Sequence, residues 1–310
     1  MRVLITGGAG YIGTSLIFEL VTNPEISEII IFDNLSRKNY NLFLAEKYPY
    51  KPIRFVKGDV LDSRKLRQVL QGVDIVYHLA AKVTTPFANE NPHSFEQVNH
   101  WGTAELSYAI EDSDVQTVIY TSSTSVYGPS DTEINETTVP RPKTYYGISK
   151  FQGEHMISRL EEQRKAIVLR LGNVYGYNKS MRFDAVINKF MFEAHFLNHI
   201  TVQGSGVQSR AFINIDKVAT VLDKLPHMDV PSGTYNLVER NLSINEIAEH
   251  TQEIYPDLQI TYIQQELELN SIAVSPESVL NAYDLVKESD FKRELLLFKD
   301  SFAFKLYNRH

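Results

Sequence analysis

The sequence predicts a doubly wound α/β fold with a parallel sheet, followed by a smaller lobe. Short apolar runs rich in β-branched residues recur through residues 1–170, and they do not alternate with polar residues. Such runs are typical of strands that are buried on both faces. Helical stretches separate most of these runs, and this alternation predicts right-handed βαβ units in a parallel sheet.

The expected strands are short apolar runs placed far enough apart for a crossover helix. They are Arg2–Thr6, Glu28–Phe32, Ile53–Lys57, Asp74–Leu79, Val115–Thr121 and Ala166–Leu171. The helices expected beside them are Thr14–Val21, Ser63–Gln71, Ser94–Glu111 and Tyr145–Glu162.

The remainder of the chain is less regular. It predicts a helix at Arg182–Phe196, strands at Ala211–Ile215 and Thr234–Val238, and a helix at Asp216–Leu225. Ser243, with Glu246 three residues later, forms a capping-box pattern at the start of a helix that runs to Ile254. We therefore expect residues 1–170, with a returning segment at about 211–238, to form the sheet domain. Residues 171–210 and 239–310 then form the smaller lobe.

The composition is that of a globular protein, and it argues against nucleic-acid-binding and membrane-spanning proteins. Of the 310 residues, 43% are hydrophobic and 22% are charged, which is close to the average of globular domains. The net charge of -7 argues against a nucleic-acid partner, and no apolar run is long enough to span a membrane. The chain has no Cys, so it has no disulfide or thiolate metal site, and we expect no metal. The cytoplasm is the expected location.

A glycine-rich loop joins the first expected strand to the first expected helix. Gly7, Gly10 and Gly13 stand three residues apart within the segment Thr6–Gly13. In this context Gly7 allows a tight turn, Gly10 lets a pyrophosphate approach the backbone, and Gly13 lets the helix pack closely on the sheet. The loop therefore predicts a dinucleotide site on a Rossmann-type sheet, against the alternative of a purely structural turn.

Two acidic residues follow strands beside this loop. Asp33 ends the second strand about 20 residues beyond the glycines, where a carboxylate binds the adenosine ribose hydroxyls. Because a carboxylate repels a 2′-phosphate, NAD is favoured over NADP, although Arg37 in the next loop would weaken that preference. Asp59 is a candidate acceptor for the adenine amino group. The alternative for Asp33 is a strand-ending turn with Asn34.

The candidate catalytic centre is a Tyr-x-x-x-Lys pair. Two such pairs occur, Tyr146/Lys150 and Tyr175/Lys179. Side chains four residues apart share one face only within a helix. Tyr146 begins a long helical stretch, whereas a turn is expected after Tyr175, so we assign the chemistry to the first pair. The Lys150 ammonium, together with the positive charge of an oxidised nicotinamide, would favour the phenolate and lower the pKa of Tyr146 toward that of a general base.

Five short sequence motifs, including the glycine loop and the first Tyr-x-x-x-Lys pair, occur in order along the chain. They are Thr6–Gly13, Gly58–Asp59, His78–Ala81, Thr121–Gly128 and Tyr146–Lys150. Together they resemble the extended short-chain dehydrogenase/reductase family, in its NAD-dependent sugar-nucleotide epimerase/dehydratase branch. The resemblance runs from Met1 to about Val238 and is looser beyond Gly176. It implies an NAD-binding Rossmann domain and a substrate-binding C-terminal lobe.

The resemblance also implies roles for individual residues. Ser123, four residues before Tyr127, matches the serine that hydrogen-bonds the reacting sugar oxygen, with Ser122 and Thr124 as alternatives. Asn99 lies where the family asparagine supports the geometry of the active site. The expected substrate contacts are Thr85, Ser123, Asn173 and Arg210, of which the last two would bind the diphosphate. The expected cofactor contacts are Gly7, Gly10, Tyr11, Ile12, Gly13, Asp33, Asn34, Asp59, Val60, Leu79, Ala80, Ala81, Asn99, Tyr146 and Lys150.

The residues after Ser123 indicate the reaction. Family dehydratases carry an acidic pair directly after the catalytic Ser or Thr, and decarboxylases carry a Glu two residues after it, but here the residues are Thr124 and Ser125. Without those acids an elimination lacks its proton donor and acceptor. We therefore expect an NAD-dependent epimerase of a nucleotide-diphosphate sugar, acting at C4 through hydride abstraction, a keto intermediate and hydride return.

Three alternatives remain open. They are an NAD(P)H-dependent reductase of a 4-keto-6-deoxy sugar nucleotide, a sugar-nucleotide dehydratase, and a non-catalytic NAD-binding sensor. The family commonly dimerises through the two helices expected at Ser94–Glu111 and Tyr145–Glu162. The resemblance therefore implies a homodimer.

Overall fold

A seven-stranded parallel sheet forms the centre of the protein. The structure, a computed structural model, describes residues 1–44, 51–83, 91–130, 132–264, 271–286 and 289–302. The strand order is β3-β2-β1-β4-β5-β6-β10, and every pairing in it is parallel. This arrangement confirms the predicted Rossmann-type fold. The strands are β1 (Arg2–Thr6), β2 (Glu28–Asp33), β3 (Ile53–Lys57), β4 (Ile75–His78), β5 (Thr117–Ser123), β6 (Lys165–Leu171) and β10 (Gly233–Leu237).

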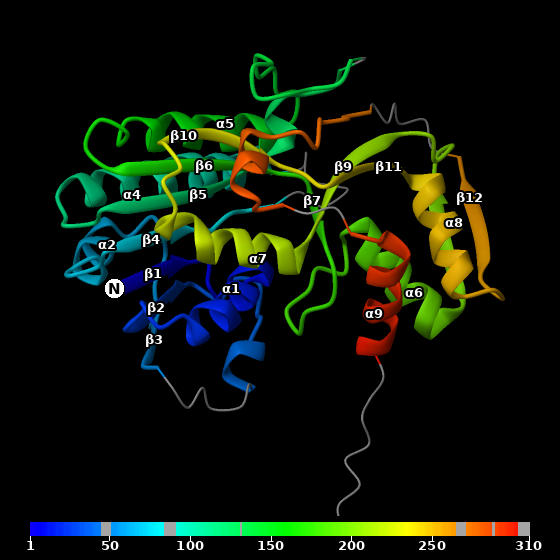
Figure 1. Cartoon of the computed structure of the whole chain (residues 1–310), viewed down its shortest axis with the longest axis horizontal. Helices are drawn as coiled ribbons and strands as arrows, with labels where there is room; N and C mark the ends of the chain where they lie inside the picture. The colour runs from blue at the N-terminus through cyan, green and yellow to red at the C-terminus, as the bar shows by residue number, and fades with distance from the viewer. Residues whose placement is uncertain (45–50, 84–90, 131, 265–270, 287–288, 303–310) are drawn as a thin grey trace, which may run out of the picture.

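Helices cover both faces of this sheet (Figure 1). On one face lie α1 (Tyr11–Thr22) and α7 (Ile215–Lys224), and on the other α2 (Ser63–Val69), α4 (Gly102–Glu111) and α5 (Tyr145–Ser158). Successive residues of a strand point to opposite faces. In β1, Ile5 accordingly packs in the core under α1, whereas Leu4 packs under α4 and α5. This two-sided burial explains why the strands read as unbroken apolar runs.

The helical stretch expected at Ser94–Glu111 is not one regular α-helix. It consists of α3 (Pro92–Phe95), a π-helical segment η3 (Glu96–Trp101) and α4. Each π-turn adds a residue to the helical turn, so it changes which side chains face inward. Here it coincides with the fully buried side chain of Asn99.

Outside the central sheet, the described residues form two minor sheets and helices that pack beside them, and we call this part the smaller lobe (Figure 1). Strands β7 (Asn173–Tyr175), β9 (Ser209–Asn214) and β11 (Arg240–Ser243) form one sheet, and β8 (His199–Gln203) pairs with β12 (Gln259–Ile263). The helices are α6 (Val186–Leu197), α8 (Ile244–Ile254) and α9 (Phe291–Ser301). The predicted capping box is present at α8, where Ser243 and Glu246 cap each other's backbone N–H groups.

Short helical turns complete the described chain. The 3-10 turns are η1 (Asn41–Leu44), η4 (Thr124–Val126), η5 (Leu225–His227) and η6 (Val279–Tyr283). None of the helices in the described ranges has the length and apolar character needed to cross a membrane.

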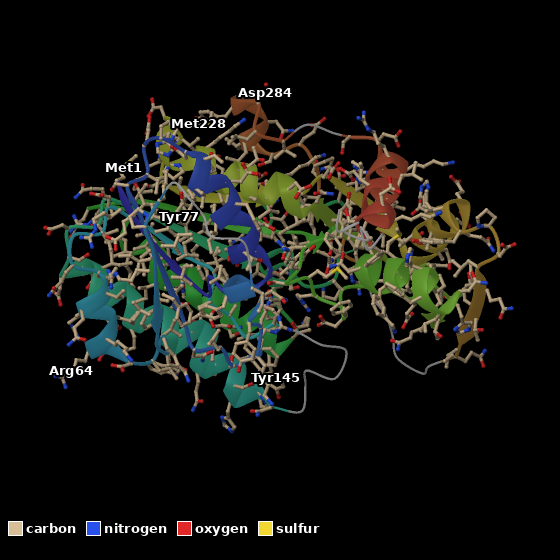
Figure 2. The ribbon with its side chains drawn as sticks, turned by 90° about the horizontal axis from the view of Figure 1, so that it is seen from below. Met1, Arg64, Tyr77, Tyr145, Met228 and Asp284 are labelled. Carbon is tan, nitrogen blue, oxygen red and sulfur yellow. The ribbon has the colours of Figure 1, made fainter. Side chains whose placement is uncertain are left out.

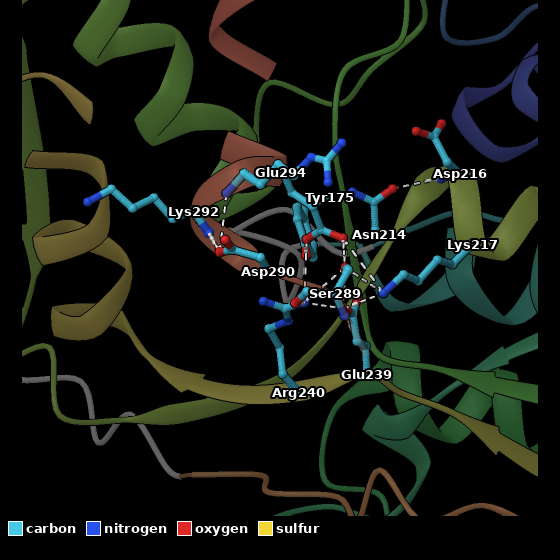
Figure 3. Close-up of polar contacts among 11 residues, drawn as sticks. Tyr175, Asn214, Asp216, Lys217, Glu239, Arg240, Ser289, Asp290, Lys292 and Glu294 are labelled. Atoms are coloured by element: carbon cyan, nitrogen blue, oxygen red, sulfur yellow. Dashed lines mark hydrogen bonds and ion pairs between the residues drawn. The ribbon is translucent and has the colours of Figure 1, made fainter. Parts of the chain in front are cut away.

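A buried cluster of charges ties α9 to the sheet domain (Figure 3). The Lys217 ammonium on α7 lies 2.5 Å from the Glu239 carboxylate, whose side chain is fully buried. Arg240 contacts Glu239 and stands 3.5 Å from Glu294 on α9. The hydroxyl of Tyr175 donates a hydrogen bond to Glu294. The two cations and two anions balance, which makes their burial tolerable.

Candidate active site

A cavity of about 530 Å³ lies at the carboxyl ends of β1, β2, β4, β5 and β6. Ligands of doubly wound sheets bind at this edge, near the point where the strand order reverses. The smaller lobe closes the other side of the cavity. The predicted residues that line it are Gly7, Gly10, Tyr11, Ile12, Gly13, Asp33, Asn34, Val60, Leu79, Ala80, Ala81, Ser123, Tyr146, Lys150, Asn173 and Arg210.

The glycine loop is packed too tightly for side chains. Gly7 has a φ of +70°, and a Cβ there would lie 2.6 Å from the backbone nitrogen of Ala80. A Cβ on Gly13 would lie 2.5 Å from the Cα of Gly8, so this glycine lets α1 start against the loop. Gly10 is the N-cap of α1 and offers no side-chain cap. The first N–H groups of the helix therefore face the cavity as an anion-binding end.

The start of α5 brings the candidate catalytic side chains together. Thr144 caps the helix by accepting a hydrogen bond from the backbone of Gly147. A Cβ on Gly147 would lie 2.6 Å from the carbonyl oxygen of Ser125, so the glycine allows α5 to approach the end of β5. Tyr146 and Lys150 follow one turn apart on α5 and line the same cavity as Ser123.

Comparison with known proteins agrees with this geometry. The family model described as "NAD dependent epimerase/dehydratase family" matches residues 3–237. The chain belongs to this family.

The similar curated proteins and solved structures include both epimerases and dehydratases, the two activities in the family's description. Human dTDP-D-glucose 4,6-dehydratase is 33% identical over 76% of this chain and 68% of its own length. YtcB of Bacillus subtilis (strain 168), an uncharacterized UDP-glucose epimerase, is 30% identical over 74% of each chain. The structure of a UDP-N-acetylglucosamine 4-epimerase from Methanobrevibacter ruminantium M1 covers 97% of both chains at 25% identity, with a TM-score of 0.81. The predicted family resemblance is thus confirmed.

The adenosine end of the cavity fits the NAD on which this family depends. The Asp33 carboxylate accepts hydrogen bonds from the backbone N–H groups of Leu35, at 2.7 Å, and Ala9, at 3.1 Å. These bonds hold the side chain between the glycine loop and the loop after β2. Burial raises the pKa of Asp33, and the two backbone N–H groups oppose that shift. Asp33 is therefore fixed where the family's ribose-binding carboxylate is expected.

Burial changes the pKa of both members of the candidate catalytic pair. Burial raises the pKa of Tyr146, while the Ser123 side chain and the charge of Arg182 oppose the shift. Burial also lowers the pKa of Lys150 to about 7, against the effect of the Glu154 carboxylate. In the protein alone, loss of solvent penalises both charged forms. The predicted lowering of the Tyr146 pKa includes the charge of an oxidised nicotinamide, and it stays a prediction.

Two predicted site residues, Asn99 and Asp59, do not line the cavity in the described structure. The Asn99 side chain accepts from the backbone N–H of Lys82 and donates to the Lys82 carbonyl and to Ser149. It therefore joins the loop after β4 to α5 behind the cavity wall. Asp59 accepts a hydrogen bond from the Asn34 side chain at 2.8 Å. Thr85 lies outside the described residues.

The predicted phosphate ligands come from two adjacent strands of the lobe. Asn173 at the start of β7 donates a hydrogen bond to the carbonyl of Ala211 at 3.0 Å. Arg210 on β9 is partly buried, and its guanidinium donates to the carbonyl of Ser209 at 2.9 Å. Burial lowers the pKa of Arg210. Both residues line the same cavity as the glycine loop.

Sequence patterns did not identify every residue of the cavity wall. Arg182 lies in the loop after β7 and pairs with Asp184 at 2.6 Å. The sequence predicts that a helix begins at Arg182, but α6 begins only at Val186, so both residues lie in the loop before it. Arg37 and Ser122, both considered from the sequence, also line the cavity. The polar lining residues to which the sequence assigned no role are Ser36, Asn39, Lys82, Thr121, Ser125, Arg182, Asp184 and Gln208.

The second Tyr-x-x-x-Lys pair does not form a helical pair. Tyr175 is buried at the end of β7, and Lys179 lies in the loop that follows. The prediction that only the first pair shares a helix face is therefore confirmed.

Proposed function

We propose that this protein is an NAD-dependent epimerase that inverts C4 of a nucleotide-diphosphate sugar. The observation that supports this choice is the absence of a free acid beside the catalytic pair, within the part of the chain that the structure describes. The carboxylates among the described lining residues are Asp33, which is hydrogen-bonded to the glycine loop, and Asp184, which is paired with Arg182. Thr124 and Ser125 occupy the positions where family dehydratases carry acids.

Proton transfer is assigned to Tyr146. The phenolate takes the proton from the sugar hydroxyl at C4 and returns it after the keto-sugar has presented its opposite face. The Ser123 hydroxyl, at the end of β5, holds the same sugar oxygen. The Lys150 ammonium stabilises the phenolate through its charge.

The sheet domain holds the cofactor and the smaller lobe holds the nucleotide. The loop from Gly7 to Gly13 and the N-terminus of α1 bind the pyrophosphate of NAD, and Asp33 binds its adenosine ribose. When bound, NAD supplies a reversible hydride acceptor. Asn173 and Arg210 bind the diphosphate of the substrate, for which a guanidinium has suitable geometry.

A second candidate is a sugar-nucleotide dehydratase. The 33% identity to human dTDP-D-glucose 4,6-dehydratase favours it. That reaction needs an acid and a base in addition to Tyr146, and on the described chain these would have to come from residues other than Thr124 and Ser125.

Product analysis distinguishes the candidates. The purified protein is incubated with UDP-, GDP-, CDP- and dTDP-sugars and catalytic NAD, and the products are resolved by chromatography and NMR. A C4 stereoisomer formed without net NADH supports the epimerase, and a 4-keto-6-deoxy product supports the dehydratase. Turnover that requires a keto-sugar and stoichiometric NADH or NADPH shows a reductase. Binding of NAD with no turnover of any sugar nucleotide indicates a sensor.

Tyr146 is tested with a matched neighbour. Tyr146→Phe removes the hydroxyl that carries the proton, and we expect kcat to fall by about 10²–10⁴. Tyr145→Phe is the control, because this adjacent side chain is 47% exposed and does not line the described cavity. Equal losses in both variants would assign the effect to α5 as a whole and refute the proposed role.

We also propose a cytoplasmic homodimer. Trp101 and Tyr108 on one helical stretch and Tyr145 and Ile148 on α5 expose 53%, 39%, 47% and 38% of their surface. Figure 2 shows Tyr145 at the periphery of the molecule. An exposed set of large apolar side chains on two adjacent helices is suited to a subunit interface. The cysteine-free chain fits a reducing compartment.

A further inference from the structure

The aromatic ring of Tyr120 lies directly against the catalytic lysine. Tyr120 is on β5, three residues before Ser123, and its side chain is fully buried. The Lys150 ammonium stands 4.1 Å from the centroid of this ring. Lys150 itself is only 2% exposed, so little water solvates its charge.

The rest of the structure holds the ring in this position. The Tyr120 hydroxyl donates to the backbone carbonyl of Lys150 at 3.4 Å. A Cβ on Gly153 would lie 2.4 Å from that hydroxyl, so the glycine in the middle of α5 provides the space for it. His78 on β4 stacks on the ring with centroids 5.3 Å apart.

The other titratable groups around the Lys150 ammonium are neutral or already paired. Burial and the charge of Lys150 lower the pKa of His78 to about 3, so this imidazole is neutral. Burial raises the pKa of Tyr120 well above its usual value, so the phenol is neutral as well. On α5 itself, Tyr146 precedes Lys150 by one turn, and Glu154 follows it by one turn. Glu154 is already paired with Arg170 at 2.6 Å.

We infer that Tyr120 is a positioning residue whose ring face stabilises the ammonium form of Lys150 beside Tyr146. This inference rests on the proposed role of Lys150 in catalysis. The face of an aromatic ring is electron-rich, and its attraction for a cation is stronger when the cation is desolvated. The ring therefore compensates for part of the water that Lys150 loses, while Gly153 and the hydroxyl contact fix its distance.

The first measurement is a titration that does not depend on activity. The protein is labelled with ¹³C-lysine, and the Cε signal of Lys150, assigned by its loss in Lys150→Arg, is followed by NMR against pH. Tyr120→Leu removes the ring, and we expect its Lys150 to lose the proton at least about one pH unit lower than in the parent protein, a tenfold change. Tyr120→Phe keeps the ring face and should titrate close to the parent.

Tyr77→Leu is the matched control. Tyr77 is a fully buried tyrosine on β4, but it packs on the opposite face of the sheet, in the core under α1 and α7 (Figure 2). We expect this variant to lose thermal stability without a change in the Lys150 titration. If Tyr120→Leu does not fold, Gly153→Ala takes its place with the same expectation, because its methyl group displaces the intact ring.

The pH profile of kcat provides the functional measurement. Loss of the ring should move the alkaline limb, where Lys150 deprotonates, to lower pH by the same amount, and Tyr120→Phe should restore it. Identical titrations of Lys150 in Tyr120→Leu and the parent overturn the inference, as does an equal shift in Tyr77→Leu. A parent protein that turns over no sugar nucleotide refutes the proposed function instead, and the NMR result stands independently of it.

Discussion

The buried ion pair between Glu154 and Arg170 offers a sharp test of the packing beneath the active site. The side chains are 5% and 7% exposed, and the guanidinium donates to the carboxylate through Nη2 at 2.6 Å and Nε at 3.0 Å. Ser122 donates a further hydrogen bond to the carboxylate at 2.5 Å. Glu154→Gln preserves the shape of the side chain but removes its charge.

The expected cost follows from the burial of Arg170. Once the carboxylate is gone, the guanidinium has lost its counter-ion in a place that solvent hardly reaches. Breaking a buried pair from one side costs about 3–5 kcal/mol of unfolding free energy. Replacing both partners by apolar residues, as in Glu154→Leu with Arg170→Met, leaves no unpaired charge, so we expect the double variant to recover most of that loss.

Urea unfolding followed by circular dichroism measures the effect. The control is Glu111→Gln, which breaks the ion pair with Arg159 at 3.1 Å. The partners there are 33% and 47% exposed, so the expected loss is about 0–1 kcal/mol. A Glu154→Gln variant within about 1 kcal/mol of the parent, or a double variant less stable than Glu154→Gln, would refute the claim that this pair is desolvated and mutually dependent.

Three further predictions concern other parts of the molecule. Gly7→Ala should weaken NAD binding in calorimetry by more than tenfold, because a Cβ at this φ of +70° clashes with Ala80. The control is Gly72→Ala, at a φ of +67° away from the cavity, which should lower stability without changing NAD affinity. The pKa of His78 is about 3 in the folded protein, below its ordinary value of 6.5, so the unfolded chain binds the proton first as the pH falls. The free energy of unfolding should therefore fall by up to about 1.4 kcal/mol per pH unit below pH 6.5. His78→Gln should flatten that slope in urea titrations, and an unchanged slope would contradict the assignment. If the proposed dimer forms through this surface, Trp101→Glu should convert it to a monomer in light scattering, whereas Leu297→Glu, on the exposed surface of α9, should not. A parent protein that is already monomeric would rule out the proposed interface.

The sheet domain could be predicted because its strands are buried on both faces. Runs such as Glu28–Phe32 and Ala166–Leu171 have no polar face, and the glycine loop directly follows the first strand. The start of α5 was predictable for a similar local reason, since a helical pattern begins at Tyr145, although its cap Thr144 was recognised only in the structure. Local signals therefore identified the cavity edge that carries Ser123, Tyr146 and Lys150.

The parts that depend on distant contacts could not be predicted. The π-turn at Glu96–Trp101 has no distinct composition, and the inward position of Asn99 follows from its partners on two other segments. Strands β8 and β12 are separated by more than fifty residues and are recognisable only as a pair. The sequence shows the charged neighbour of Tyr146 but not the burial that raises the pKa of Tyr146 in the protein alone.

The path of the chain between the sheet and the smaller lobe restricts how this enzyme can change its substrate. Only Gly172 separates β6 from β7, no residue separates β9 from α7, and only Val238 and Glu239 separate β10 from β11. Such short connections leave little slack for a wide hinge rotation. If the lobe were exchanged for that of a relative, the chain would have to join correctly at each of these short connections. New substrate specificity is therefore more accessible through substitution of the Arg182 and Asp184 side chains, which line the cavity before α6, than through exchange of the whole lobe.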